Sequence, residues 1–234
     1  MQEKTVQNRA IAFLENYYRR RWWRRKVFAA AEVRTKRKYG GKRADGLLVF
    51  QGWLTGKPYV VSIEAKSKKT LPAIKPYHDQ KRWWYNCLRF GFFMGLGTGL
   101  IFLGFYANDL TTFLLVLVWS LLAGMAYGLL TWNSNRHKTI DVIDQVRHYP
   151  ANEQWLTFST DAFEALMPKQ QKALRQISRN YGVGLLLIGK NKHKQILHRP
   201  SGRWYWFWDA RFGGKWIGDF LVYYSREEEI RGVI

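Results

Sequence analysis

The sequence contains very little cysteine and none of several common catalytic or cofactor motifs. Cys87 is the single cysteine among 234 residues, so no disulfide forms within the chain, as is usual for a reducing cytosolic setting. The first residues carry no apolar segment of the kind found in cleaved signal peptides. Zinc-ligand clusters, a P-loop, a dinucleotide fingerprint and a Ser-His-Asp set are also missing. These absences argue against a zinc site, nucleotide binding through a P-loop or a dinucleotide-binding fold, and serine-hydrolase catalysis.

Negative charge is scarce as well. The chain has 38 Lys and Arg but 17 Asp and Glu, which gives a formal net charge of +21. Most of the excess lies before residue 90, where 22 basic residues stand against 6 acidic ones. Such an excess suits phosphate-rich partners, either nucleic acid or anionic lipid headgroups. Composition alone does not separate these two classes of partner.

Charge is nearly absent from one long apolar run, residues 90–132, in which Asp109 is the single charged residue. The run divides at Asn108-Asp109 into two segments, each long enough to cross a hydrocarbon core that needs about 17–25 residues. Neither segment has the polar stripe that core helices of soluble proteins keep. Lys and Arg flank the run on both sides, which marks the cytoplasmic side. We therefore predict a multi-pass protein of the inner (cytoplasmic) membrane, with a transmembrane α-hairpin and both termini cytoplasmic.

Glycines recur every four residues in the first predicted span, at Gly91, Gly95 and Gly99. Small residues at this spacing let two helices approach closely. The partner of this glycine face is either the second span or another subunit, so a homo-oligomer is one expectation.

The remaining sequence predicts alternating helices and strands. Residues 5–21 have helical periodicity, and three strand-like runs follow at 27–35, 44–51 and 59–67. After the apolar run we expect a helix at 138–149, a strand at 154–159, and a helix from Asp161 to about Tyr181 that stops at Gly182. The apolar run 183–189 predicts a strand buried on both faces. Neither part makes a well-covered sheet alone, so we expect them to form one α/β domain.

The third strand-like run carries the residues best suited to chemistry. Because strand side chains alternate between faces, Glu64 and Lys66 share one face while Val61, Ile63 and Ala65 point to the other. Asp45 begins the preceding strand and would lie beside them if the two strands form a hairpin. A buried carboxylate-amine cluster is costly unless it binds something. Two carboxylates suit Mg²⁺, and a lysine beside them suits phosphodiester hydrolysis; a solvated Glu64–Lys66 ion pair is the alternative.

These residues resemble a known family, the PD-(D/E)XK nuclease superfamily. Arg43-Ala44-Asp45-Gly46 is similar to its first motif, and Glu64-Ala65-Lys66 is similar to its second. The resemblance implies a restriction-endonuclease-like mixed sheet flanked by helices. It implies that Asp45, Glu64 and the Ala65 carbonyl bind Mg²⁺, or Mn²⁺ in its place, with Lys66 catalytic. Many members also place a glutamate of the first helix near the metal, and Glu15 is the residue that suits this role.

A further motif narrows the resemblance. Gln145 and Tyr149 are similar to the Gln-x-x-x-Tyr motif of RecB-like and Mrr-like members, and their spacing puts both on one helical face. The resemblance and the apolar run together predict the following organisation: the first part of a nuclease-like domain (1–67), a basic linker (68–89), two transmembrane helices (90–132), the second part of the domain (133–192) and an aromatic-rich C-terminal extension (193–234).

Basic residues interleave with tryptophan just after the first predicted helix. Basic groups neutralise phosphates and aromatic rings stack on unpaired bases, although an anionic membrane surface would attract the same residues. We predict nucleic-acid binding by Arg19, Arg20, Arg21, Arg24, Arg25 and Lys26. The leading hypothesis is a membrane-anchored, Mg²⁺-dependent DNA endonuclease, with incoming foreign DNA as one substrate. The alternatives are a non-enzymatic membrane adaptor that tethers nucleic acid or an acidic partner, and a membrane scaffold.

Overall fold

The computed structural model divides the chain into two compact units. It describes all residues except 23–25, 52–55, 69–74, 106–109, 191–192 and 202–218. The first unit joins Met1–Lys75 to Ile140–Ile234, and the second is Pro76–Thr139. The prediction that the two segments flanking the apolar run form one domain is therefore confirmed.

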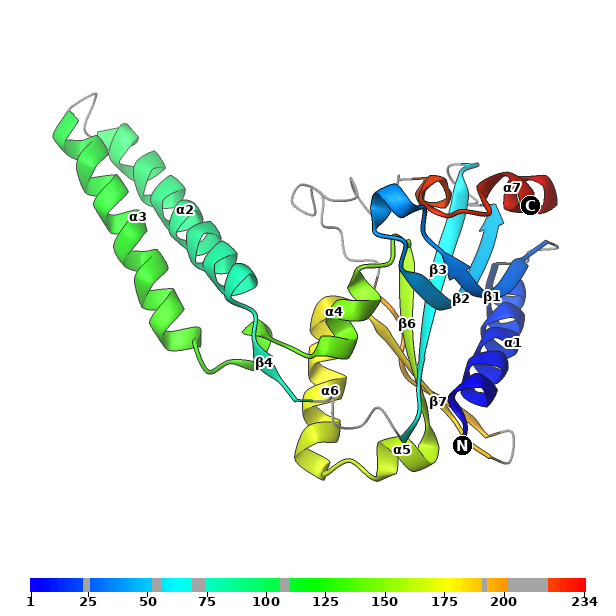
Figure 1. The fold of residues 1–234 in the computed structure, drawn as a ribbon. Helices are drawn as coiled ribbons and strands as arrows, with labels where there is room; N and C mark the ends of the chain where they lie inside the picture. The colour runs from blue at the N-terminus through cyan, green and yellow to red at the C-terminus, as the bar shows by residue number, and fades with distance from the viewer. Residues whose placement is uncertain (23–25, 52–55, 69–74, 106–109, 191–192, 202–218) are drawn as a thin grey trace. The chain divides into compact units, whose positions relative to one another are not determined.

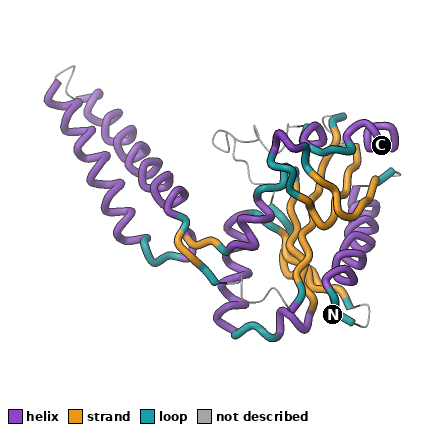
Figure 2. The backbone as a smooth tube through the Cα atoms, viewed as in Figure 1, coloured by secondary structure: helices purple, strands orange, loops and turns teal. Residues whose placement is uncertain are grey.

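The first unit is built on a six-stranded mixed sheet of order β1-β2-β3-β6-β7-β8 (Figure 1, Figure 2). Its strands are β1 (Phe28–Arg34), β2 (Arg43–Gln51), β3 (Pro58–Lys66), β6 (Glu153–Ser159), β7 (Gly184–Ile188) and β8 (Lys194–His198). The first three form an antiparallel meander, β3, β6 and β7 run parallel, and β8 returns antiparallel to β7. Strands β6 and β7 are buried along their whole length, and for β7 this confirms the prediction from its continuous apolar run.

Helix α1 (Glu3–Trp22) covers one face of the sheet. Its buried side chains, Val6, Ala10, Leu14 and Tyr18, recur at helical spacing and pack in one cluster with Val61, Ile63 and Ala65 of β3. The alternation predicted for β3 is confirmed, because the apolar set faces α1 and the polar set faces the opposite side.

The opposite face is covered in two parts. Helices α4 (Asp141–Arg147), α5 (Thr160–Glu164) and α6 (Pro168–Tyr181) pack on β6 and β7. The short helix η4 (Phe220–Tyr223) and α7 (Glu227–Val233) pack on β1, β2 and β3, through Phe220, Leu221 and Ile230. We expected residues 193–234 to be a separate extension. Instead β8 belongs to the sheet, and η4 and α7 complete the core.

Two predicted helices differ from the structure. The helix expected over 138–149 is reduced to α4, because Lys138–Thr139 form strand β5, which pairs with β4 (Tyr77–His78). The helix expected from Asp161 to Tyr181 is two helices. Pro168 begins α6, and Met167 before it is extended (φ −59°, ψ 148°), since a residue that precedes proline avoids the helical region. The predicted stop at Gly182 is confirmed, with φ 70°.

The second unit consists mainly of two long helices, α2 (Gln80–Phe105) and α3 (Leu110–Thr131), with η3 (Asn135–His137) and the β4–β5 pair at one end. Because β4 and α2 begin before residue 89, the linker expected over 68–89 is shorter. Among the described helices, α3 alone is long and apolar enough to cross a membrane, and 11% of its apolar window is buried.

Gly91, Gly95 and Gly99 of α2 face α3. A Cβ at Gly91 would collide with the Ser120 carbonyl and one at Gly95 with the Ser120 hydroxyl, while Gly124 of α3 lies against the Cys87 carbonyl. Glycine therefore brings the two helices together. The face that we considered for contact with another subunit is already occupied by α3.

Candidate active site

Strand β3 presents a polar row to the face opposite α1. Ser62, Glu64 and Lys66 are all buried, with Glu64 2% and Lys66 8% exposed. The Lys66 ammonium donates to Oε1 of Glu64 at 2.6 Å. The solvated ion pair considered above is therefore wrong, because both charged groups are removed from water.

The β2–β3 hairpin brings the second carboxylate to this row. Gly46 pairs with Ile63, which places Asp45 beside Glu64. The Ala65 amide donates to Oδ2 of Asp45 at 2.8 Å, and the Gln7 side chain donates to the Asp45 carbonyl. A Cβ at Gly46 would lie 2.8 Å from Cγ1 of Ile11, so glycine at this position lets α1 approach the start of β2.

Helix α4 supplies the third side of the site. The Gln145 side-chain amide donates to Oε1 of Glu64 at 2.6 Å. Tyr149 lies just after the helix, is 2% exposed, and its hydroxyl donates to the Arg43 carbonyl at 2.7 Å. The structure thus brings together Asp45, Glu64, Lys66, Gln145 and Tyr149.

Gln154 of β6 is a positioning residue that the sequence motifs missed. Its side-chain amide is buried and donates to the carbonyls of Val146 and Tyr149, at 3.0 and 2.7 Å. These bonds satisfy carbonyls left open where α4 ends and hold the end of the helix against the sheet. The available signal was its position in a predicted strand. That strand pairs with β3, and Gln154 lies opposite Ser62 of the polar row.

The electrostatics of the site show a shortage of positive charge. Burial, followed by the nearby Asp45 carboxylate, raises the pKa of Glu64 to about 7, although Lys66 opposes the shift. Burial also raises the pKa of Asp45. Within the described part of the chain, Oε2 of Glu64 is buried and has no hydrogen-bond partner. A buried carboxylate oxygen without a partner is costly, so the cluster suits an added cation.

The side chains of this site are of the chemical type that binds a divalent metal. The described residues contain no group of three or more His, Cys, Asp or Glu placed to hold a metal ion. Mg²⁺, however, is usually held by one or two carboxylates and keeps several waters. Asp45 and the unpartnered oxygen of Glu64 match that donor set.

The first helix brings a different glutamate near the site from the one expected. Glu15 pairs with Arg19 at 2.7 Å on the helix surface and lies eight residues, or roughly 12 Å along the axis, beyond Gln7. Glu3, by contrast, is close enough to contribute to the raised pKa of Glu64. Of the two glutamates of α1, Glu3 is therefore the one placed nearer to Glu64.

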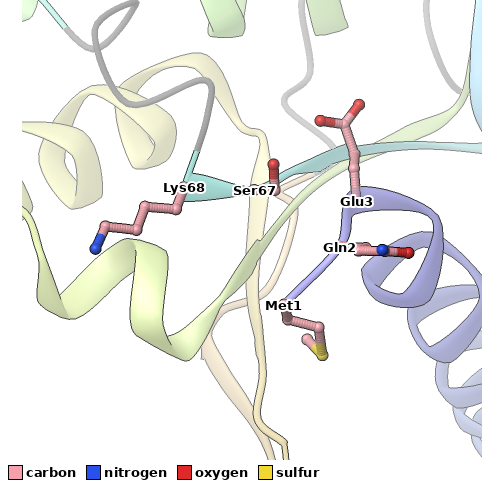
Figure 3. A pocket seen from close by; sticks show the side chains of 5 residues that line it. All are labelled: Met1, Gln2, Glu3, Ser67 and Lys68. Atoms are coloured by element: carbon pink, nitrogen blue, oxygen red, sulfur yellow. The ribbon is translucent and has the colours of Figure 1, made fainter.

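A pocket of 640 Å³ adjoins the end of β3. Its lining residues are Met1, Gln2, Glu3, Ser67 and Lys68, which come from the start of α1 and the residues just after β3 (Figure 3). Ser67 and Lys68 directly follow Lys66, so the pocket lies beside the end of β3 that carries Lys66.

The basic segment at the end of α1 lies apart from the site. Arg19 and Arg20 are exposed at the end of α1 that is remote from Gln7 and Asp45, and Lys26 is exposed before β1. The Arg21 side chain and all of Arg24 and Arg25 lie outside the described residues. Within the described part of the chain, α1 donates a hydrogen bond to the site through Gln7, and Arg19, Arg20 and Lys26 form none with Asp45, Glu64 or Lys66.

No model of a known protein family matches the chain, and comparisons with curated proteins and with solved structures find no match either.

Proposed function

We propose that this chain is a membrane-anchored, Mg²⁺-dependent DNA endonuclease of the PD-(D/E)XK type. The observation that carries the proposal is the buried Glu64–Lys66 pair beside Asp45, with one Glu64 oxygen left unpartnered. Most buried polar atoms in proteins have a hydrogen-bond partner, so an unpartnered carboxylate oxygen favours a role beyond a structural ion pair. Here the second carboxylate and the raised pKa of Glu64 favour a site that is completed by a cation.

Each residue of the site has a separate role in the proposed reaction. Asp45 and Glu64 would hold Mg²⁺, with the Ala65 carbonyl as a further ligand that the family resemblance implies. The metal, when bound, lowers the pKa of a bound water and stabilises negative charge on a phosphoryl oxygen. Lys66 is positioned by Glu64 to orient the attacking water or to donate to the phosphate. Gln145 and Tyr149 hold Glu64 and the start of β2 in place.

The membrane part of the proposal rests on the second unit. Large apolar side chains are exposed along both helices, including Phe92, Phe93, Leu115, Leu121 and Leu129. Soluble proteins rarely expose contiguous apolar surface on this scale, whereas helices in a bilayer do. Basic residues flank the apolar run 90–132, which favours a cytoplasmic position for both ends; they are Lys81, Arg82, Arg89, Arg136 and Lys138. A nuclease held there would meet DNA that crosses the membrane.

Plasmid cleavage by the detergent-purified full chain tests the proposal. We expect nicking and linearisation with Mg²⁺ and none with EDTA. Asp45→Asn and Lys66→Met should each reduce the rate at least 100-fold, because each removes a group at the reacting centre. Asp141→Asn and Lys42→Met change the same residue types at exposed positions and should leave the rate unchanged.

The competing functions give different results in the same assay. If the Asp45 and Lys66 variants cut as well as the wild type, the nuclease assignment is wrong. Salt-sensitive DNA binding without cleavage, retained in both variants, would indicate the non-enzymatic adaptor.

A further inference from the structure

Helix α6 presents a row of positive charge on the outer surface of the first unit. Its buried side chains are Leu174, Ile177, Ser178 and Tyr181, which face the sheet. The outward face carries Lys169, Lys172, Arg175 and Arg179, all exposed. The helix sequence contains no acidic residue. At about 1.5 Å per residue, the four cations extend over roughly 15 Å.

Three of these four charges have no counter-charge among the described residues. Lys169, Lys172 and Arg175 form no ion pair in the part of the chain that the structure describes. Arg175 lies over the Phe163 ring at 5.2 Å, which orients the guanidinium but leaves its charge uncompensated. Like charges three residues apart on one helix repel each other, so Lys169, Lys172 and Arg175 together are unfavourable unless a polyanion contacts them.

The row lies on the same face of the sheet as the candidate site. Leu156 pairs with Glu64 in β3–β6 and packs in one cluster with Leu174 and Ile177 of α6. Phe158 pairs with Lys66, and the chain continues from that edge through α5 into the start of α6. A polyanion that runs along α6 therefore reaches the edge of the sheet where Lys66 lies.

We propose that the outward face of α6, defined by Lys169, Lys172, Arg175 and Arg179, binds the phosphate backbone of double-stranded DNA. This inference rests on the proposed nuclease function and specifies its substrate. Single-stranded binding sites combine basic residues with aromatic rings on which bases stack. The exposed face of α6 has no aromatic residue, because Tyr181 is buried. A continuous cationic row without stacking groups matches the dense phosphate charge of a duplex.

The test is binding of a fluorescent 20-base-pair duplex to the full chain in detergent with EDTA, over a series of salt concentrations. The variant is the triple Lys169→Gln/Lys172→Gln/Arg175→Gln. Each lost phosphate contact reduces the salt slope by about 0.9, which corresponds to about 8-fold in affinity at 0.1 M salt. We expect a loss of at least 8-fold for the duplex and a smaller loss for a single strand, whose phosphate charge is less dense.

A matched control removes the same charge from another surface. Arg37, Lys38 and Lys42 are exposed around η1 (Arg37–Tyr39), and their triple change to Gln should leave the salt slope within 0.5 of the wild type. Equal losses in the two triples, or no loss in the α6 triple, would overturn the inference. So would an α6 triple that keeps duplex binding but no longer binds vesicles containing phosphatidylglycerol, because the face would then contact lipid.

Cleavage measured in parallel separates the two proposals. If the wild type cuts DNA with Mg²⁺ and the α6 triple binds and cuts duplex normally, the α6 inference alone fails. If the wild type binds duplex through α6 but never cuts, the nuclease proposal fails and the binding surface stands. The supported outcome is a triple whose KM for duplex rises while its kcat stays near that of the wild type.

Discussion

The side-chain amide of Gln145 donates to Oε1 of Glu64 at 2.6 Å, across 81 positions of sequence and the whole second unit. The bond joins α4, which follows the helical pair, to β3, which precedes it. It shows that the inserted unit leaves the two halves of the candidate site in register.

Removing this bond should impair the site without unfolding it. Gln145→Met keeps the side-chain length but takes away one donor to Glu64, which raises the Glu64 pKa further. We expect cleavage to fall about 10-fold near pH 7 and the pH profile to move to higher pH. Gln195→Met, at an exposed position in β8, should leave both rate and profile unchanged. An unshifted profile for Gln145→Met would contradict a positioning role.

The two glutamates of α1 should differ in their effect on metal use. Glu3 lies near Glu64, whereas Glu15 is paired with Arg19. We expect Glu3→Gln to raise the Mg²⁺ concentration for half-maximal cleavage several-fold and Glu15→Gln to leave it unchanged. Mg²⁺ titrations of cleavage by both variants measure this difference. A larger effect of Glu15→Gln would show that Glu15, and not Glu3, acts on the metal site.

The raised pKa of Glu64 makes stability depend on pH. Its folded pKa of about 7 exceeds the ordinary value of 4.5, so the folded state holds the proton more tightly. The stability that this group contributes is present below pH 4.5 and is lost as pH rises toward 7. The difference amounts to roughly 3 kcal/mol.

Comparison of the metal-free wild type with Glu64→Gln isolates this effect from other titrating groups. Between pH 5 and pH 8 the wild type should lose more of its unfolding free energy than the variant does. Mg²⁺ should stabilise the wild type more at pH 8 than at pH 5, and Glu64→Gln at neither. Parallel curves for the two proteins would show that Glu64 is not the titrating group.

Packing between α2 and α3 gives a paired prediction at two glycines. A side chain at Gly95 would meet Ser120, but one at Gly97 would meet nothing within 4 Å. Gly95→Leu should therefore destabilise the helical pair by about 1–3 kcal/mol through overpacking. Gly97→Leu should be tolerated. Thermal unfolding of the two variants in detergent measures the difference.

An arginine in the middle of α3 distinguishes a lipid environment from water. Leu121 is 55% exposed. In a bilayer, Leu121→Arg costs about 2.5–3.5 kcal/mol on insertion scales, so the amount of membrane-integrated protein should fall. On a helix exposed to water the change would be harmless or would improve solubility. Alkaline extraction of membranes from cells that produce Leu121→Arg or Leu121→Ile reports the outcome.

Local patterns determined much of this protein. Alternation along β3 placed Glu64 and Lys66 on one face, because side-chain direction in a strand is set by the backbone itself. Local patterns also predicted that Asp45 lies beside Glu64 in a short hairpin. They likewise predicted two long helices within the apolar run. The i, i+4 spacing of Gln145 and Tyr149 likewise brought both to one side of the site, although Tyr149 lies beyond the helix end.

Tertiary structure decided the features that depend on contacts between distant segments. Which glutamate of α1 lies nearer to Glu64 depends on how α1 docks against Gly46, which is a contact between distant segments. The glycines of α2 are occupied by α3 because both helices belong to one compact unit. Phe220 and Ile230 complete the core of β1–β3 from the far end of the chain. Side-chain burial and the charge left unpartnered on Glu64 are properties of the assembled fold, since no local pattern specifies which distant groups remove water from a residue.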